Sequence, residues 1–189
     1  MSNHWEKKLS ESFGINASLD ILDGEYDLNF FANAINEKYV MKVMRVGCEP
    51  DFINMQCAAI RMLDGKNLCT PEIIPTVSGA DFASINDEEG NLRLVWVIKA
   101  KSGICYSKIY PRSTNFINDL GAKIGGLNKV LKKFNHPYLD RDFKWNLMKS
   151  NWITDHLYLI SDSDRKDILI NIIEEYNSVL HKAKKLPQF

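Results

Sequence analysis

The sequence lacks the features that would place it in a membrane or in a disulfide-stabilised class. No apolar run approaches the roughly 20 residues that span a bilayer, and residues 1–8 lack the apolar core of a secretion signal. The four cysteines form no C-x-x-C pair and have no histidine pattern nearby. Neither a zinc site nor a disulfide framework is therefore expected, and we predict reduced thiols in a cytoplasmic protein without a membrane partner.

An excess of one charge sign is also missing. Twenty-four basic residues balance twenty-four acidic ones, which gives no reason to expect a nucleic-acid partner. There is no G-x-x-x-x-G-K or G-x-G-x-x-G sequence and no recognisable nucleophile motif. What remains is a 189-residue chain with 45% hydrophobic residues, which is typical of a globular protein that needs no metal to fold.

The first half of the sequence has the periodicity of strands. Trp5, Leu9 and Phe13 are spaced four apart and predict a short helix over residues 4–13. Three strands follow, over residues 17–22, 28–35 and 38–45. Their connections are tight, and a parallel pair needs a long crossover, so the three strands are predicted to be antiparallel.

A helix interrupts the strands. Pro50 is expected to begin it and Leu63 to end it. Its apolar stripe is predicted to consist of Phe52, Met55, Ala59, Ile60 and Leu63. Two short extended pieces over residues 73–77 and 81–85 come next, and residues 92–99 form the most apolar strand, which we place centrally.

Helices dominate after Gly103. Ser113 is predicted to cap a long helix that runs to about Lys133. The last helix is expected to begin at a capping box formed by Ser161 and Asp164. Its apolar stripe includes Ile172, Ile173, Tyr176 and Leu180.

This order of elements predicts an α+β fold. A five-stranded antiparallel sheet with one helix would form a protein-kinase-like N-lobe over residues 1–101. Residues 102–189 would form the helical beginning of an incomplete C-lobe.

One lysine stands out within that order. Residues 39–43 lie on the third strand and end in an apolar-x-Lys pattern at Lys42. Nucleotide phosphates need a cation held rigidly in a cleft, which a lysine on a paired strand supplies. The alternative interpretation is a solvated charge on a sheet edge.

The later segments carry a resemblance to a known family. They show a Leu120-Gly121 helix, a Phe134-x-His136-Pro137 segment and a Trp145-Asn146-Leu147 element. This pattern resembles the hydroxylysine-kinase-like branch of the aminoglycoside phosphotransferase and choline kinase superfamily, except that Asn146 replaces an aspartate. The resemblance runs from about Ser10 to the C-terminus. It implies ATP as cofactor, with magnesium in the intact enzyme, and a hydroxylated amine or amino acid as acceptor.

The resemblance also implies roles for particular residues. Lys42 matches the phosphate-pairing lysine, and Gly24 and Asn29 lie in the loop that would cover the phosphates. The matching hinge, whose backbone would meet adenine, consists of Val97, Ile98 and Lys99, although these also fit an ordinary central strand. Kinases place a glutamate on the helix opposite the lysine.

In this sequence that helix position holds Gln56. Glutamine accepts a hydrogen bond from an ammonium group but cannot neutralise its charge. We expect Gln56 to lie within hydrogen-bonding reach of Lys42, with Glu49 as the alternative partner, and Val40 and Met44 to lie on the adenine side of the strand.

The catalytic elements of the superfamily are absent from the sequence. No histidine is followed two positions later by the aspartate that phosphoryl transfer needs. The two D-x-D matches, at residues 140–142 and 162–164, are interpreted as a turn and a helix cap. We therefore expect a truncated or isolated domain without catalytic or metal-binding residues, inactive alone. Its partners would be the nucleotide, a small-molecule substrate and the remaining C-lobe, and its exposed last helix would favour a homodimer.

Two other functions stay open. The chain would be a non-catalytic binding module if the fold serves only as a scaffold, which Gln56 and the missing motifs favour. It would be an appended domain of a fused enzyme if it belongs with the members of the branch that carry a class III, pyridoxal-phosphate-dependent aminotransferase-like domain.

Overall fold

A computed structural model describes residues 2–66, 68–141, 143 and 145–183. The chain divides into two compact units, residues 1–138 and 139–189. Within the described ranges, none of the helices has both the length and the apolar composition needed to cross a membrane.

The first unit contains a sheet and three α-helices. The helices are α1 (Ser2–Phe13), α2 (Pro50–Leu63) and α3 (Thr114–Leu131), with a short 3-10 turn η1 (Tyr106–Lys108) before α3. The strands are β1 (Ser18–Leu22), β2 (Leu28–Asn33), β3 (Lys38–Val43), β4 (Glu72–Ile74), β5 (Ala83–Asn86) and β6 (Leu92–Lys99).

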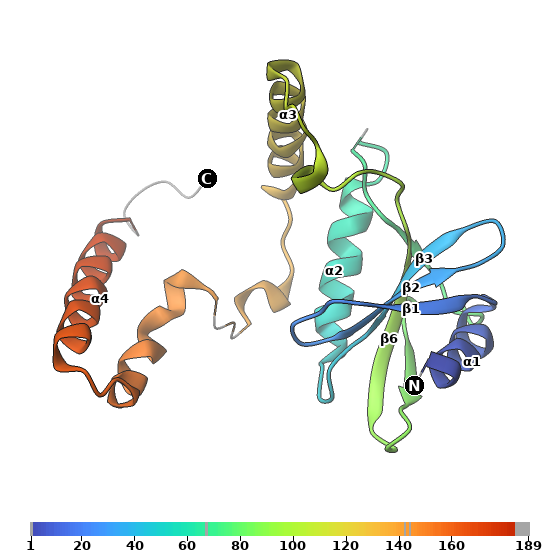
Figure 1. Cartoon of the computed structure of the whole chain (residues 1–189), viewed down its shortest axis with the longest axis horizontal. Helices are drawn as coiled ribbons and strands as arrows, with labels where there is room; N and C mark the ends of the chain where they lie inside the picture. Colours follow the sequence, from blue (N-terminus) through green and yellow to red (C-terminus); the bar gives the residue numbers. More distant parts are fainter. Residues whose placement is uncertain (1, 67, 142, 144, 184–189) are drawn as a thin grey trace. The chain divides into compact units, whose positions relative to one another are not determined.

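All six strands form one antiparallel sheet (Figure 1). The strand order is β1-β2-β3-β6-β4, and β5 pairs with β6 as well. β6 therefore pairs with three other strands, as expected for the most apolar strand of the chain.

The two faces of the sheet have different hydrophobic cores. On one face, α1 buries Trp5, Leu9 and Phe13 against the sheet. On the other face, α2 packs Ile53 and Cys57 against a smaller cluster. The sheet residues of this smaller cluster are Met44, Leu94 and Trp96. Figure 1 shows α1 and α2 on opposite sides of the strands.

The predicted N-lobe fold is confirmed, with three differences in detail. The sheet has six strands rather than five, since the two short extended pieces both pair with β6. A second helix, α1, covers the sheet. The buried face of α2 is also wider than predicted, because Ile53 and Cys57, one turn apart, meet the sheet as well. The predicted Met55 and Leu63 are buried, and Phe52 packs half-buried against the same cluster and against Tyr138.

The α3 helix begins as predicted. The Oγ of Ser113 accepts a hydrogen bond from the Phe116 N–H at 3.2 Å, which satisfies one of the unpaired donors of the first turn. The change from strands to helices follows Lys99, close to the predicted lobe boundary, but compactness groups α3 with the sheet.

The second unit is helical and open. Its elements are the 3-10 segment η3 (Leu147–Leu159) and α4 (Ser163–Ala183), after a short turn η2 (Pro137–Asp140) at the boundary. None of its described side chains is fully buried. The predicted capping box is wrong by one residue: Asp162 rather than Ser161 caps α4, because its Oδ1 accepts the Arg165 N–H at 3.0 Å. Asp142 of the earlier D-x-D match lies outside the described residues.

Candidate functional site

Lys42 lies on β3, in the middle of the face that α2 covers. Its neighbours across the sheet are Asn29 on β2 and Trp96 on β6. Directly opposite residues of an antiparallel pair project to the same side, so these three side chains form one row. Lys42 is half-buried, and its Nζ donates a hydrogen bond to the Asn29 Oδ1 at 2.9 Å.

The loop between β1 and β2 is held against β3. Asn29 Nδ2 donates to the Asp27 carbonyl oxygen at 3.1 Å, and Asp27 Oδ1 accepts the Arg45 N–H at 2.9 Å. Gly24 lies so close that a Cβ there would come within 2.5 Å of Asn29 Nδ2 and 2.4 Å of the Asp27 oxygen. The single glycine of this loop is thus needed for space.

A second row on the same face is apolar. Phe31, Val40 and Ile98 pair across β2, β3 and β6, next to the Lys42 row. All three are half-buried, so they present an apolar surface that the first unit leaves partly open. Met44, in contrast, is buried under α2 and lines no open surface.

Sequence analysis missed Phe31. The available signal was its position two residues after Asn29 on a predicted strand, which places both side chains on one face.

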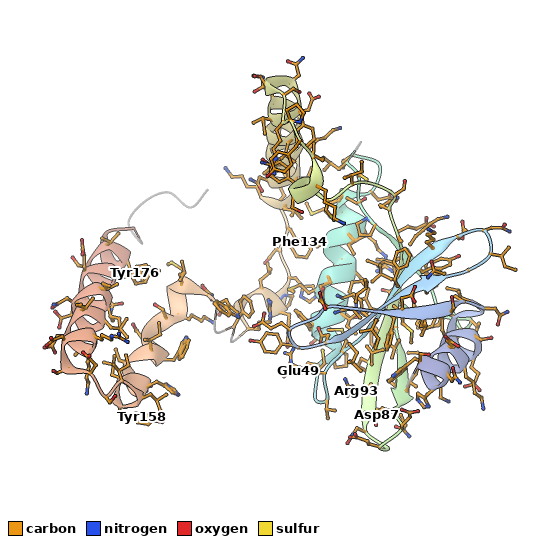
Figure 2. All side chains as sticks on the ribbon, in the orientation of Figure 1. Glu49, Asp87, Arg93, Phe134, Tyr158 and Tyr176 are labelled. Carbon is orange, nitrogen blue, oxygen red and sulfur yellow. The ribbon has the colours of Figure 1, made fainter. Side chains whose placement is uncertain are left out.

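The expected helix partner of Lys42 is not used. Gln56 Nε2 donates to the Phe52 carbonyl oxygen of its own helix at 3.2 Å. Glu49 is exposed at the start of α2, where Figure 2 labels it. In the described part of the chain Lys42 has no hydrogen bond or ion pair with either residue, and Asn29 is its partner instead.

The predicted hinge residues lie inside the sheet. Val97, Ile98 and Lys99 are each paired on both sides, with β3 and with β4. A central strand uses its backbone groups in its two ladders, so these three have none to offer adenine. The free backbone begins beyond Ala100, whose N–H still donates to the Lys38 carbonyl oxygen at 2.8 Å.

Side chains at the predicted hinge also point elsewhere. Val97 is fully buried in the core under α1. Lys99 forms an ion pair with Glu37 of the β2–β3 turn, and that hydrogen bond raises the pKa of Lys99. Hydrogen bonds from Lys99 and then from Tyr39 lower the pKa of Glu37. The Lys99 side chain therefore links the end of β6 to the β2–β3 turn and is not directed toward a nucleotide.

A cavity of about 610 Å³ lies at the C-terminal end of α2, and Lys42 is not among its lining residues. The Arg61–Asp81 ion pair and Lys101 are among its lining residues, and none of the predicted site residues is. No group of three His, Cys, Asp or Glu side chains within the described ranges is arranged to hold a metal ion.

Comparison with known proteins rests on solved structures, since no family profile and no curated protein matches the chain. An amicoumacin kinase, in complex with AMP-PNP, Ca²⁺ and Ami, superposes with a TM-score of 0.71 at 16% identity. The match covers 99% of this chain and 55% of that one. The chain has the fold of small-molecule kinases.

Two further structures support that statement. A spectinomycin phosphotransferase in complex with ADP and spectinomycin matches with a TM-score of 0.62 at 13% identity, over 100% of this chain and 60% of that one. A microcompartment-associated aminopropanol kinase matches with a TM-score of 0.61 at 15% identity. This match covers 82% of this chain and 48% of that one. The chain thus spans only about half to three fifths of the length of these kinases.

Proposed function

We propose that this chain is the nucleotide-binding N-terminal part of an ATP-dependent small-molecule phosphotransferase. The observation that carries the proposal is the position of Lys42. It is a half-buried lysine on a central strand, held by a side-chain hydrogen bond and next to an open apolar row. A fixed cation beside an apolar surface suits the phosphates and the base of a nucleotide.

The residues have distinct roles in this proposal. Lys42 pairs phosphate oxygens, and the loop from Gly24 to Asn29 covers them. Val40 and Ile98, with Phe31, form one side of the adenine pocket. The backbone that meets the edge of adenine belongs to residues 101–104, because the strand residues before them are committed to the sheet.

The chemistry itself needs residues that this sequence does not contain. None of the four histidines precedes an aspartate at the spacing that a catalytic loop requires. In the intact enzyme the rest of the C-lobe would supply the base and the magnesium ligands. The acceptor, a hydroxylated amine or amino acid, is part of the same proposal. It is supported by the name of one similar structure, an aminopropanol kinase.

Calorimetric titration with AMP-PNP and Mg²⁺ tests the binding part. The chain should bind weakly, and Lys42→Ala should weaken binding at least about tenfold, the usual size of a lost charge-assisted contact. Lys7→Ala, which removes an exposed lysine from α1, is the matched control. Equal affinities of the chain and the Lys42→Ala variant would contradict the assignment of Lys42.

A coupled assay tests the catalytic part. The purified chain should transfer no phosphate to any aminoalcohol, because it has no catalytic base. Metal-dependent turnover that survives repeated purification would refute this. Reading the gene beyond codon 189 for an in-frame H-x-D-x-x-x-x-N separates a truncated kinase from the other interpretations, including a fused aminotransferase-like enzyme.

The second candidate is a non-catalytic binding module. The observation that favours it is Gln56, which replaces the usual carboxylate and bonds to its own helix. Nucleotide binding that is indifferent to Lys42, or no nucleotide binding together with no catalytic motif in the gene, would favour this candidate.

A further inference from the structure

We infer that Asn29, on the strand beside Lys42, takes over the positioning role that kinases assign to a carboxylate on the neighbouring helix. The inference rests on the proposed function. In this inference Asn29 is a positioning residue, and no side chain of α2 positions Lys42 directly.

The first support is the orientation of the Asn29 amide. Its Nδ2 donates to the Asp27 carbonyl oxygen at 3.1 Å, and its Oδ1 accepts from Lys42 Nζ at 2.9 Å. The flipped amide would place NH₂ against an ammonium group and oxygen against oxygen, so both partners select the same orientation. The acceptor that meets Lys42 is therefore fixed from two sides.

The second support is the packing of the loop around Asn29. A Cβ at residue 24 would come within 2.5 Å of Asn29 Nδ2, so only glycine leaves the amide in place. The loop is also tied to the segment that follows β3, because Asp27 Oδ1 accepts the Arg45 N–H at 2.9 Å. Asn29 thus lies at the start of β2, where the preceding turn is held by its own hydrogen bonds.

The third support comes from α2. Gln56 directs its amide N–H to the Phe52 carbonyl oxygen, one turn back along the same helix. The helix is anchored by Ile53 and Cys57, which lie in the core beneath it. The hydrogen bond that holds the Lys42 side chain in the described part of the molecule therefore comes from β2 and not from α2.

This arrangement has a consequence for ligand binding. An ammonium group has three donors, and one is used by Asn29, which leaves two for phosphate oxygens. Asn29 is neutral, so the full positive charge of Lys42 remains for the phosphates, whereas a carboxylate would offset it. Movement of α2 would then change nucleotide binding little.

The test measures the reactivity of Lys42 in the complete, ligand-free chain. Acylation of Lys42 by an amine-specific reagent is followed by peptide mass spectrometry at fixed pH. Asn29→Ala should raise the acylation rate about tenfold, because the Lys42 amine loses the hydrogen bond that holds it in place and becomes more accessible to the reagent. Asn29→Asp should lower the rate below that of the unmodified sequence, since an ion pair would hold the Lys42 side chain in place more firmly.

Two further variants make the result specific. Asn33→Ala removes a similar side chain from the same strand, where it donates to Asp20 at 2.8 Å, and should leave the rate unchanged. Gln56→Ala tests the rival role of α2. An unchanged rate in Asn29→Ala, or a rise in Gln56→Ala as large as that in Asn29→Ala, would overturn the inference.

Nucleotide affinity is the second readout. With AMP-PNP and Mg²⁺, Asn29→Ala should weaken binding by a smaller factor than Lys42→Ala. If the chain binds no nucleotide at all, the proposed function fails, but the acylation series still decides whether Asn29 holds Lys42. Circular dichroism of each variant checks folding. If Asn29→Ala does not fold, the acylation rate of Asn29→Asp decides whether residue 29 holds Lys42.

Discussion

The two faces of the sheet differ in how completely their side chains are buried. Under α1, the cluster is closed and apolar, and residues from every strand except β4 contribute fully buried side chains to it. Under α2, the cluster is smaller, and the rows beside it contain Lys42, Asn29 and three half-buried apolar residues. One face stabilises the sheet, and the other leaves chemical groups partly exposed. Such a division suits a domain that must be rigid and yet bind a ligand.

Phe30→Ala would test the α1 face most strongly. The Phe30 side chain is 1% exposed within the α1-side cluster. Its truncation leaves a cavity and should lower the free energy of unfolding by ~3–5 kcal/mol. Urea denaturation measures the loss. Ile35→Ala, at a side chain 99% exposed, is the control and should change stability by less than ~0.5 kcal/mol. Similar losses in both variants would mean that the α1 face is not the main core.

Cys57→Ser would test the α2 face with a nearly isosteric change. Cys57 is fully buried among apolar side chains, so the serine hydroxyl would enter without a prepared partner. The expected loss is ~1–3 kcal/mol. Cys69→Ser, at an exposed thiol, should have no measurable effect. A neutral Cys57→Ser variant would show that the α2 face is wetter than described.

The hairpin between β5 and β6 is shared by both faces, and Asp87→Asn would test it. Asp87 and Arg93 form an ion pair at 3.2 Å, and both are labelled in Figure 2. Burial by itself would raise the pKa of Asp87, but hydrogen bonds from Asn91 and Glu89 and the Arg93 charge outweigh it and lower the pKa.

A lowered pKa in the folded state stabilises the protein above the ordinary value of 3.8, and the stabilisation disappears as pH falls through the folded value. Asp87→Asn should therefore be less stable than the original sequence at pH 7. Its loss of unfolding free energy should be smaller than that of Cys57→Ser. The difference should shrink below about pH 4. Urea midpoints at both pH values measure it. A difference that does not vary with pH would mean that the carboxylate charge is irrelevant.

The smallest expected effect lies at alkaline pH. Burial raises the pKa of the Cys57 thiol to about 11 from the ordinary 9.0. A raised folded pKa gives stability that is complete below pH 9 and is lost as pH rises through about 11, because the unfolded chain releases its proton first. Cys57→Ala should flatten the fall in stability between these pH values. Parallel profiles for the two proteins would contradict a buried, protonated thiol.

The sequence predicted the elements that depend on local pattern. The bounds of α2 and β6 match, because Pro50 begins the helix and the apolar run of residues 94–98 makes the strand. Ser113 was identifiable as a cap from its residue type and position. Lys42 was placed on β3 by its position after two strands.

The missed features depend on partners that are distant in the sequence. Nothing local shows that β4 pairs with β6, or that residues 97–99 are enclosed by two ladders. The choice of Asn29 over Gln56 depends on register between β2 and β3, which alternation alone does not define. The addition of Ile53 and Cys57 to the buried face of α2 follows from tertiary packing, since Phe52 and Ile53 are equally apolar by residue type.

The central position of β6 also bears on the time course of folding. β6 is the last strand of the sheet in the sequence, and it pairs with β3, β4 and β5. Pairs such as Met41 with Val97 are far apart along the chain, and contacts of this kind form slowly. During synthesis, the β1–β2–β3 meander would leave the ribosome with the inner edge of β3 unpaired. The sheet cannot close until Lys99 has emerged, so the nascent chain is exposed to edge-to-edge association until then.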